Sequence, residues 1–299
     1  MSFNLPPNMI LPVDEIDVRL DPTPHPFERD NADAIAAGWK EYSAANPALF
    51  DGTMVLLSAL TYDDGRLRGV SHAVRYSTFL HWRRHSDTPD AHHAFAHAMP
   101  VSGDGAVVAI RMAPHTLNAG KVYFAAGSFE PEDFVDGQVD MHRNMAREVA
   151  EETGLDLDGA QAEQRHHLIS TPGGVVIFRR YRFAETAGEL TERIHAHIAA
   201  DPDPEISEPV VIRDAAERPE GLMPYMPALI DWHFSNACPP ADSASFVPER
   251  IDRVETRTAQ RREEAEHHAD QRRETHGEQD HGRARGKGYR KGECRSASQ

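Results

Sequence analysis

The nine residues from Arg147 to Leu155 constrain this chain more than any other stretch. They read Arg-Glu-Val-Ala-Glu-Glu-Thr-Gly-Leu. Glu148, Glu151 and Glu152 stand at i, i+3 and i+4, so a helix of about 3.6 residues per turn places their carboxylates on one face. Like charges at this spacing repel each other and destabilise an isolated helix. A divalent cation such as Mg2+ or Mn2+ would offset the repulsion, because hard cations prefer oxygen ligands.

The same run carries the signals of a helix that ends at its own glycine. Gly154 suits a helix stop, because glycine adopts the left-handed conformation at little cost. Val149 and Leu155 provide the apolar side. Three glutamates alone also suit an ordinary solvated helix face, so the metal interpretation needs support from the surrounding residues.

That support comes from the order of the residues. The run 147–155 resembles the second half of the Nudix hydrolase signature, Arg-Glu-apolar-x-Glu-Glu-x-Gly-apolar, and fills each of its fixed positions. The family expects a glycine, five residues, an acidic residue and seven more before the arginine. Here Gly127 and five residues precede Asp133, but 13 residues, 134–146, separate Asp133 from the arginine. The loop is therefore six residues longer than in the signature.

The lengthened loop leaves the acidic position open. Asp133, Asp136 and Asp140 all lie within reach of it in sequence. An aspartate at any of them would replace the glutamate usual in the family.

The resemblance implies metal-dependent hydrolysis of a diphosphate linkage in a nucleoside diphosphate derivative, of the NDP-sugar or ADP-ribose type. It implies Mg2+ or Mn2+ as the cofactor, held by Glu148, Glu151, Glu152 and the backbone at Gly127. Glu148 is either a third metal ligand or the catalytic base, and Arg147 orients the carboxylates. A small-molecule substrate and a homodimer are implied partners.

Such enzymes often draw a further carboxylate from a later loop. Four candidates follow the helix: Glu185, Glu189, Glu205 and Glu208. Glu205 and Glu208 rank first, because they lie in an open acidic loop just ahead of a predicted strand.

The substrate has weaker signals. Thr171-Pro172-Gly173 resembles the proline site of ADP-ribose-cleaving members, although a turn alone explains a proline there. The long N-terminal region with Leu49 to Gly52, together with the lengthened loop, resembles members that act on UDP-sugars. Four side chains could contact phosphates or a base, or could lie on the surface: Arg75, Tyr76, Arg83 and Arg84.

Two alternatives compete with this interpretation. A Nudix-fold nucleotide-binding regulatory module without catalysis would keep the fold, but the three retained glutamates speak against it. A zinc site at His93 and His97, an i, i+4 pair, lacks an accompanying HExxH pattern, and the polar run around it suggests surface.

Composition narrows the partners and the location. The net charge is −16, and residues 250–299 hold 13 basic and 10 acidic residues, so the remainder carries 19 − 38 = −19. Such an acidic body repels nucleic-acid phosphates. The sequence contains no apolar run of about 18 residues, the length that would predict a membrane span. Cys238 and Cys294 show no metal-type spacing, and a cytoplasmic location is expected.

Strands interleaved with helices predict a layered α/β fold. The resemblance to Nudix hydrolases implies that its mixed sheet is sandwiched between helices. We expect an N-terminal α+β extension over residues 1–100, with an extended arm over 1–30 that contains a strand around Asp17–Leu20, and a loop or weak helix over 85–98. The Nudix domain is expected over 101–236, and a charged low-complexity tail over 237–299. Further helices and strands are expected at 31–46 (helix), 53–62, 67–74 (strands), 76–84 (helix), 106–112, 121–125 (strands), 141–153 (helix), 166–170, 175–183 (strands), 189–200 (helix), 210–213 (strand) and 223–234 (helix).

Overall fold

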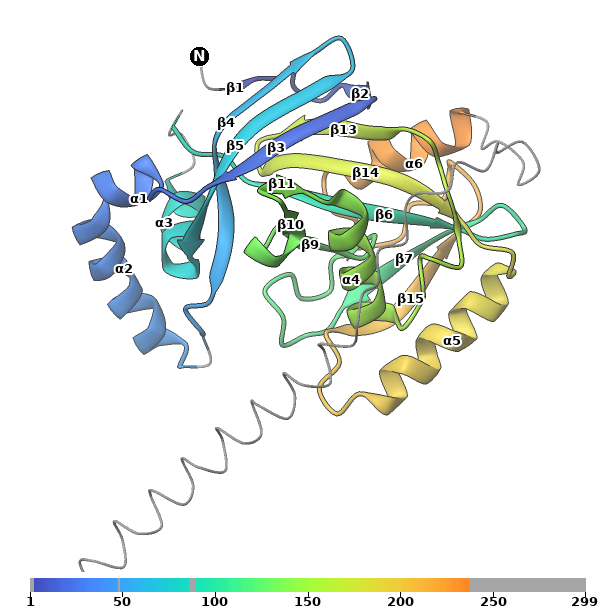
Figure 1. The fold of residues 1–299 in the computed structure, drawn as a ribbon. Coiled ribbons are helices and arrows are strands. Elements are labelled where there is room, and N and C mark those ends of the chain that lie inside the picture. Colours follow the sequence, from blue (N-terminus) through green and yellow to red (C-terminus); the bar gives the residue numbers. More distant parts are fainter. Residues whose placement is uncertain (1–2, 48, 86–89, 237–299) are drawn as a thin grey trace, which may run out of the picture. The chain divides into compact units, whose positions relative to one another are not determined.

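The computed structural model describes residues 3–47, 49–85 and 90–236, and all of these fall in one compact unit. Strands assemble into two mixed sheets with helices packed against them (Figure 1). This confirms the mixed α/β fold that the sequence predicts. Within the described ranges, no helix has both the length and the apolar character needed to cross a membrane. The predicted tail over 237–299 lies outside the described residues.

The first sheet is built mainly by the N-terminal part of the chain. In spatial order its strands are β1 (Phe3–Asn4), β4 (Thr53–Asp63), β5 (Arg66–Arg75), β3 (Glu15–Asp21), β11 (Gln138–Val139) and β10 (Phe134–Val135). Asp64 and Gly65 connect β4 to β5 with φ values of 43° and 79°. This left-handed pair is the hairpin turn that Asp63-Asp64-Gly65 predicts.

The second sheet carries the candidate site. In spatial order it contains β15 (Ile206–Ile212), β7 (Val107–Met112), β6 (Ala94–Val101), β14 (Gly174–Arg182), β13 (His166–Thr171) and β2 (Ile10–Val13). The short strands β8 (Val122–Tyr123), β9 (Ala126–Ser128) and β12 (Gln161–Ala162) pair at its sides. Strands β6 and β14 are parallel, whereas the other pairs are antiparallel. The central strands are almost wholly buried, which explains their continuous apolar runs.

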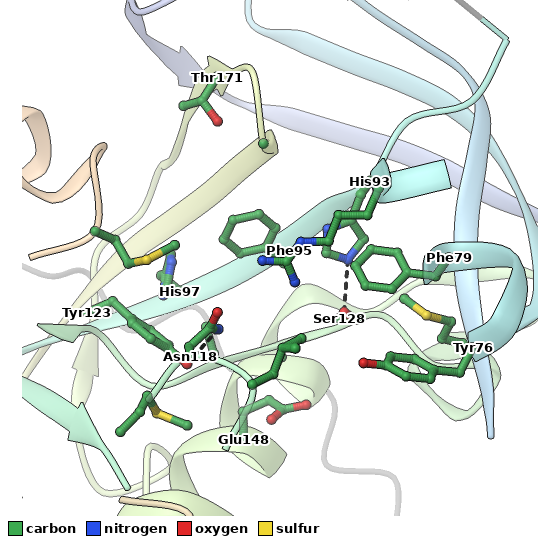
Figure 2. A pocket seen from close by; sticks show the side chains of 18 of the residues that line it. Tyr76, Phe79, His93, Phe95, His97, Asn118, Tyr123, Ser128, Glu148 and Thr171 are labelled. Carbon is green, nitrogen blue, oxygen red and sulfur yellow. Dashed lines mark hydrogen bonds between the residues drawn. The ribbon is translucent and has the colours of Figure 1, made fainter. Parts of the chain in front are cut away.

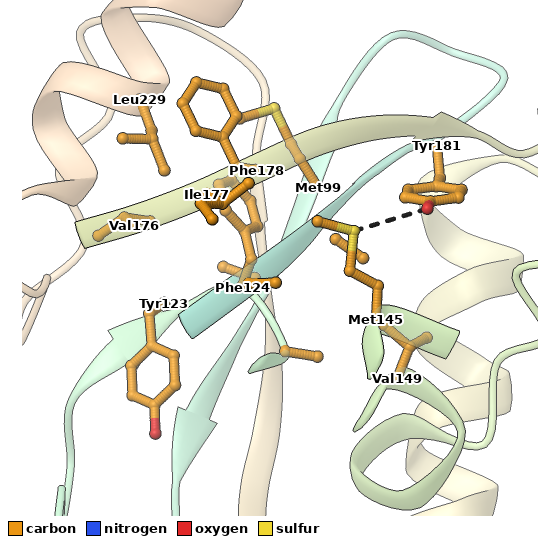
Figure 3. Close-up of a cluster of buried hydrophobic side chains, with 14 of the residues drawn as sticks. Met99, Tyr123, Phe124, Met145, Val149, Val176, Ile177, Phe178, Tyr181 and Leu229 are labelled. Carbon is orange, nitrogen blue, oxygen red and sulfur yellow. Dashed lines mark hydrogen bonds between the residues drawn. The ribbon is translucent and has the colours of Figure 1, made fainter. Parts of the chain in front are cut away.

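Helices cover both faces of this second sheet. On β14, the Tyr181 hydroxyl reaches His142 and Met145 of α4 (Met141–Thr153). Phe178, three residues earlier and thus on the other face, meets Trp232 of α6 (Met226–Ser235) with 5.1 Å between ring centroids. Figure 3 shows the buried side chains of β14 together with those of α4 and α6. Helix α5 (Ala187–Ala200) packs beside α4.

Smaller helices complete the N-terminal part and the loop before α4. They are α1 (Pro26–Asp30), α2 (Ala32–Ala45), α3 (Tyr76–Arg84) and the 3-10 helix η1 (Pro131–Asp133). Helix α3 packs against β4 and β5 of the first sheet. The helices expected over 31–46, 76–84, 141–153 and 189–200 are thereby confirmed.

The residues inserted between Asp133 and α4 form a hairpin. Strands β10 and β11 pair through a turn in which Asp136 and Gly137 have φ values of 50° and 78°. Gln138 pairs with Arg19 of β3 and donates from Nε2 to the Ile16 carbonyl at 2.9 Å. The lengthened loop therefore fastens the segment before α4 to the N-terminal sheet.

Several expectations about elements were wrong. Residues 3–30 form β1, β2, β3 and α1 rather than an extended arm, although the strand expected around Asp17–Leu20 is confirmed as β3. Residues 94–98, expected in a loop or weak helix, belong to β6, because sheet neighbours on both sides bury them. The strand over 121–125 is limited to Val122–Tyr123, and the strand expected at 210 begins at Ile206. The division of the chain into domains stays a prediction, and residue 100, its first boundary, lies inside β6.

Candidate functional site

Helix α4 is fixed at both ends. The Asp140 side chain caps its start by accepting from the Arg143 N–H at 3.0 Å. Gly154 ends it in the left-handed conformation, with φ of 67°. Met145 and Val149 are fully buried against the sheet. This packing sets the rotation of the helix and therefore the direction of its three glutamates.

The three glutamates do not share one environment. The side chain of Glu148 is 12% exposed, and Glu152 as a residue is 9% exposed. Glu152 accepts a hydrogen bond from the Ala126 N–H at 3.1 Å. Glu151 is 62% exposed and lies 3.3 Å from the Arg147 guanidinium. Two carboxylates of the motif are therefore turned inward, and the third lies at the surface.

Burial makes the two inner carboxylates hard to ionise. It raises the pKa of Glu148 to about 7, although the Arg147 guanidinium acts in the opposite direction. Burial, and then the charge of Glu148, raise the pKa of Glu152 well above its usual range. A nearby cation would favour the charged forms of both groups. The donor set is all oxygen, which fits a hard divalent ion. Within the described ranges, however, no three acidic, histidine or cysteine side chains already converge as a metal site.

Arg147 and Asp133 anchor the glutamates. Asp133 is fully buried and accepts from Arg147 Nη2 at 3.1 Å and from Asn144 Nδ2 at 2.8 Å. Arg147 Nη1 in turn contacts Glu148 Oε1 at 2.7 Å. Asp136 lies in the exposed hairpin turn and Asp140 caps α4. Of the three aspartates that the sequence left open, Asp133 is therefore the one that holds the arginine.

Gly127 lies directly against Glu148. A methyl group built on Gly127 would stand 1.9 Å from Glu148 Oε1 and 2.1 Å from its carboxyl carbon. Only glycine lets the β9 backbone come so close to this buried carboxylate. The structure thus brings together Gly127, Glu148 and Glu152.

This contact gives a testable expectation for Gly127→Ala. The methyl group must push the Glu148 carboxylate aside, so we expect any hydrolytic activity to fall roughly tenfold. Steady-state rates measure the effect, and thermal unfolding checks the fold. The matched control is Gly159→Ala, where the new methyl group would meet its nearest atom at an ordinary 3.7 Å. Equal rates in the two variants would contradict the positioning role.

A large cavity opens beside the inner carboxylates. It has a volume of about 870 Å³ and is lined by Gly127, Glu148 and Glu152 together with residues of both halves of the chain. Figure 2 shows aromatic side chains along it, from Tyr76 and Phe79 through His93 and Phe95 to Tyr123. Its size is typical of a pocket for a small molecule.

The cavity separates the candidates among the later carboxylates. Glu205 lines it. Glu208 instead pairs with Arg111 at 2.7 Å, and Glu185 pairs with Arg193 at 2.8 Å. Glu189 closes the capping box of α5. Only Glu205 of these four therefore lies at the site.

The substrate candidates divide in the same way. Tyr76, Arg83 and the segment Thr171-Pro172-Gly173 line the cavity. Arg75 pairs with Asp51 at 3.4 Å. Arg84 stacks over the Tyr42 ring at 4.0 Å and is not among the lining residues.

Two histidines were misjudged as surface residues. His93, directly before β6, and His97, on β6, are both buried and line the cavity. His93 Nε2 lies 2.8 Å from the Ser128 hydroxyl. His97 Nδ1 donates to the Phe124 carbonyl at 2.7 Å, so its Nε2 accepts from the Tyr225 hydroxyl at 3.0 Å. The bonds of His97 are thus satisfied by the fold. The helical spacing assumed for a zinc pair is absent, because His97 lies on strand β6 and His93 directly precedes that strand.

His97 predicts a pH dependence of stability. Burial lowers its pKa from 6.5 to about 4. As pH falls, the His97 imidazole therefore binds a proton in the unfolded chain before it does so in the folded protein. The contribution of His97 to stability is complete above about pH 6.5 and is lost towards pH 4. We expect the free energy of unfolding to fall over this range, and to fall less in His97→Gln. Urea unfolding at several pH values measures both, and an identical slope in the variant would contradict the assignment.

Comparison with known proteins locates similar structures. No family model and no curated protein matches the chain. Among solved structures, the MutT protein from Methanosarcina mazei Go1 is 18% identical over 48% of this chain and 93% of its own, with a TM-score of 0.32. The Nudix hydrolase RenU from M. smegmatis is 14% identical over 48% and 84%, with a TM-score of 0.33. A MutT Nudix hydrolase from Burkholderia pseudomallei is 16% identical over 46% and 95%, with a TM-score of 0.29.

The Nudix name thus recurs among similar structures, as the sequence motif suggests. At these identities and TM-scores, the likeness carries no argument about activity.

Proposed function

We propose that this protein is a Nudix-type hydrolase that cleaves a diphosphate linkage in a nucleoside diphosphate derivative with the help of Mg2+ or Mn2+. The observation that carries the proposal is the pair of buried carboxylates, Glu148 and Glu152, next to Gly127 at the wall of a cavity of about 870 Å³. Two buried acids that no internal cation fully compensates are costly, and a bound metal ion would remove that cost.

The metal would be held by Glu148, Glu152 and the backbone at Gly127, with Glu151 joining from the exposed side. A divalent cation there would neutralise the diphosphate and make the attacking water more acidic. Arg147 keeps the carboxylate of Glu148 in place through their 2.7 Å contact. Either Glu148 or Glu205 takes the proton of the water, since both line the cavity.

A panel of substrates tests the proposal. The purified full chain is incubated with UDP-glucose, ADP-ribose and other nucleoside diphosphate derivatives, each with Mg2+ or Mn2+, and the products are identified by mass spectrometry. We expect a nucleoside monophosphate and a phosphorylated second product from at least one compound. Chelation with EDTA should stop the reaction. If every compound remains intact with both metals, the proposal fails.

A second candidate is a nucleotide-binding regulatory module that does not cleave its ligand. The contact of Arg147 with Glu148 favours it, because the arginine occupies a carboxylate that the metal would need. The same panel separates the two: binding measured by calorimetry without any cleavage supports the module.

A further inference from the structure

Helix α3 presents one face to the cavity. Tyr76, Phe79 and Arg83 follow each other at i, i+3 and i+7, which places them on one side of the helix. All three line the cavity, whereas the next residue, Arg84, turns to the Tyr42 ring. We call Tyr76, Phe79 and Arg83 the α3 face.

A separate hydrophobic cluster holds this face in place. It contains Phe79 and Trp82, packed with Phe27, Met54, Leu56, Val74 and Ala91, and is distinct from the main core. The Trp82 indole donates to the Ala91 carbonyl at 2.9 Å. A ring surface backed by such packing is rigid, so a ligand loses little ordering energy on binding to it.

The rings of the α3 face continue along the cavity. Tyr76 and Phe79 have ring centroids 5.9 Å apart, Phe79 and His93 4.9 Å, and His93 and Phe95 5.3 Å. Figure 2 shows Tyr76 and Phe79 together at one side of this row. Tyr76 and Phe95 are only half-buried, so part of each ring is accessible to a ligand. Such rings favour a planar aromatic group.

The charge of the α3 face differs from that of the other walls. Among the residues that the structure describes, Arg83 is the only lysine or arginine lining the cavity, and the acidic lining residues are Glu130, Glu148, Glu152 and Glu205. In the described part of the chain, the Arg83 guanidinium has no hydrogen bond or ion pair. An arginine beside aromatic rings can bind a phosphate with two parallel hydrogen bonds.

We propose that the α3 face binds the nucleoside monophosphate end of the ligand. The base lies against Tyr76 and Phe79, and Arg83 contacts the phosphate attached to the nucleoside. This deepens the proposed function and rests on it, because the diphosphate would then extend from Arg83 towards Glu148 and Glu152. The ligand class is a phosphate that carries a base, and sugar phosphates without a base bind poorly.

Calorimetric titration of the full chain with AMP, UMP and ribose 5-phosphate, without divalent metal, tests this inference. Loss of base stacking should weaken binding about tenfold or more, so the wild type should bind AMP or UMP at least that much more tightly than ribose 5-phosphate. Tyr76→Ala should raise the Kd of the nucleotide about tenfold, and Tyr76→Phe should restore it. Arg83→Gln should weaken the binding of all the phosphates.

The controls separate binding from folding and from hydrolysis. Arg84→Gln, on the same helix but outside the cavity, should bind like the wild type. Thermal unfolding shows whether the Tyr76→Ala variant is folded. If that variant is unfolded, the nucleotide affinity of Tyr76→Phe, which keeps the aromatic ring, still tests the role of the ring. Glu152→Gln should bind AMP as the wild type does, because Glu152 lies outside the α3 face. A wild-type protein that binds AMP through Tyr76 but cleaves no substrate would contradict the proposed hydrolysis and leave the nucleotide site in place. No nucleotide binding by the wild type, or the same Kd in Tyr76→Ala, overturns the inference.

Discussion

Replacing Glu152 with glutamine is expected to lower the rate of hydrolysis about 100-fold or more, the cost typical of losing a central electrostatic group. The physical reason is its position. Glu152 is buried beside the cavity, and its carboxylate is fixed by the Ala126 N–H at 3.1 Å. Glutamine keeps the shape and an oxygen for that hydrogen bond, but it removes the negative charge that a divalent cation needs. Steady-state kinetics with Mg2+ and with Mn2+ measures the change.

Two comparisons make this result specific. Glu208→Gln removes one carboxylate from a surface pair with Arg111 and should leave the rate unchanged. Glu151→Gln should cost less than Glu152→Gln, because its side chain is 62% exposed. Calorimetric binding of Mn2+ gives a second readout, and it should weaken in Glu152→Gln. A double variant Glu151→Gln/Glu152→Gln with the wild-type rate would remove the metal assignment.

The helix that carries the motif could be predicted from sequence because its signals are local. Asp140 caps the start, Gly154 ends it, and Met145 and Val149 recur on the buried side. Neighbouring residues alone determine such features, so the observed bounds, Met141–Thr153, equal the predicted ones. The division of the glutamates into two buried and one exposed depends on how the helix packs, and the sequence does not contain that information.

Strand β6 shows where local signals failed. Residues Ala94–Val101 include four alanine or histidine residues in their first five, which have little intrinsic strand preference. Pairing with β14 on one side and with β7 and β9 on the other makes them a strand. The placement of His93, Phe95 and His97 on the cavity wall follows from that pairing. A regular i, i+2, i+4 spacing of these aromatic residues was the signal that could have indicated it.

The role of each aspartate in the inserted loop also could not be predicted without the structure. The spacing to Arg147 left Asp133, Asp136 and Asp140 equivalent, because a loop of 13 residues can bring any of them near the arginine. Pairing of β11 with β3 takes up the extra residues in a hairpin. Asp133 is then left next to α4 with a buried carboxylate.

Asp133→Ala is expected to reduce the free energy of unfolding by about 3 kcal/mol, the cost of breaking a buried ion pair by removing one partner. The carboxylate of Asp133 accepts from Arg147 at 3.1 Å, from Asn144 at 2.8 Å and from the Glu130 N–H at 2.9 Å. Each of these donors would lose a partner. Arg147 would keep its contacts with the motif glutamates, which limits the loss. Urea unfolding followed by circular dichroism measures the change.

The matched control is Asp136→Asn, which also removes one negative charge but lies in the exposed hairpin turn, where φ is 50° and asparagine is tolerated. It should change the free energy of unfolding by less than about 0.5 kcal/mol, the range usual for surface substitutions. Asp133→Asn should fall between the two, because it keeps oxygen acceptors without the charge. Because Asp133 reaches Glu148 only through Arg147, Asp133→Ala should also lower activity in conditions where the protein stays folded. Equal stability in Asp133→Ala and Asp136→Asn would show that the buried ion pair does not support the site.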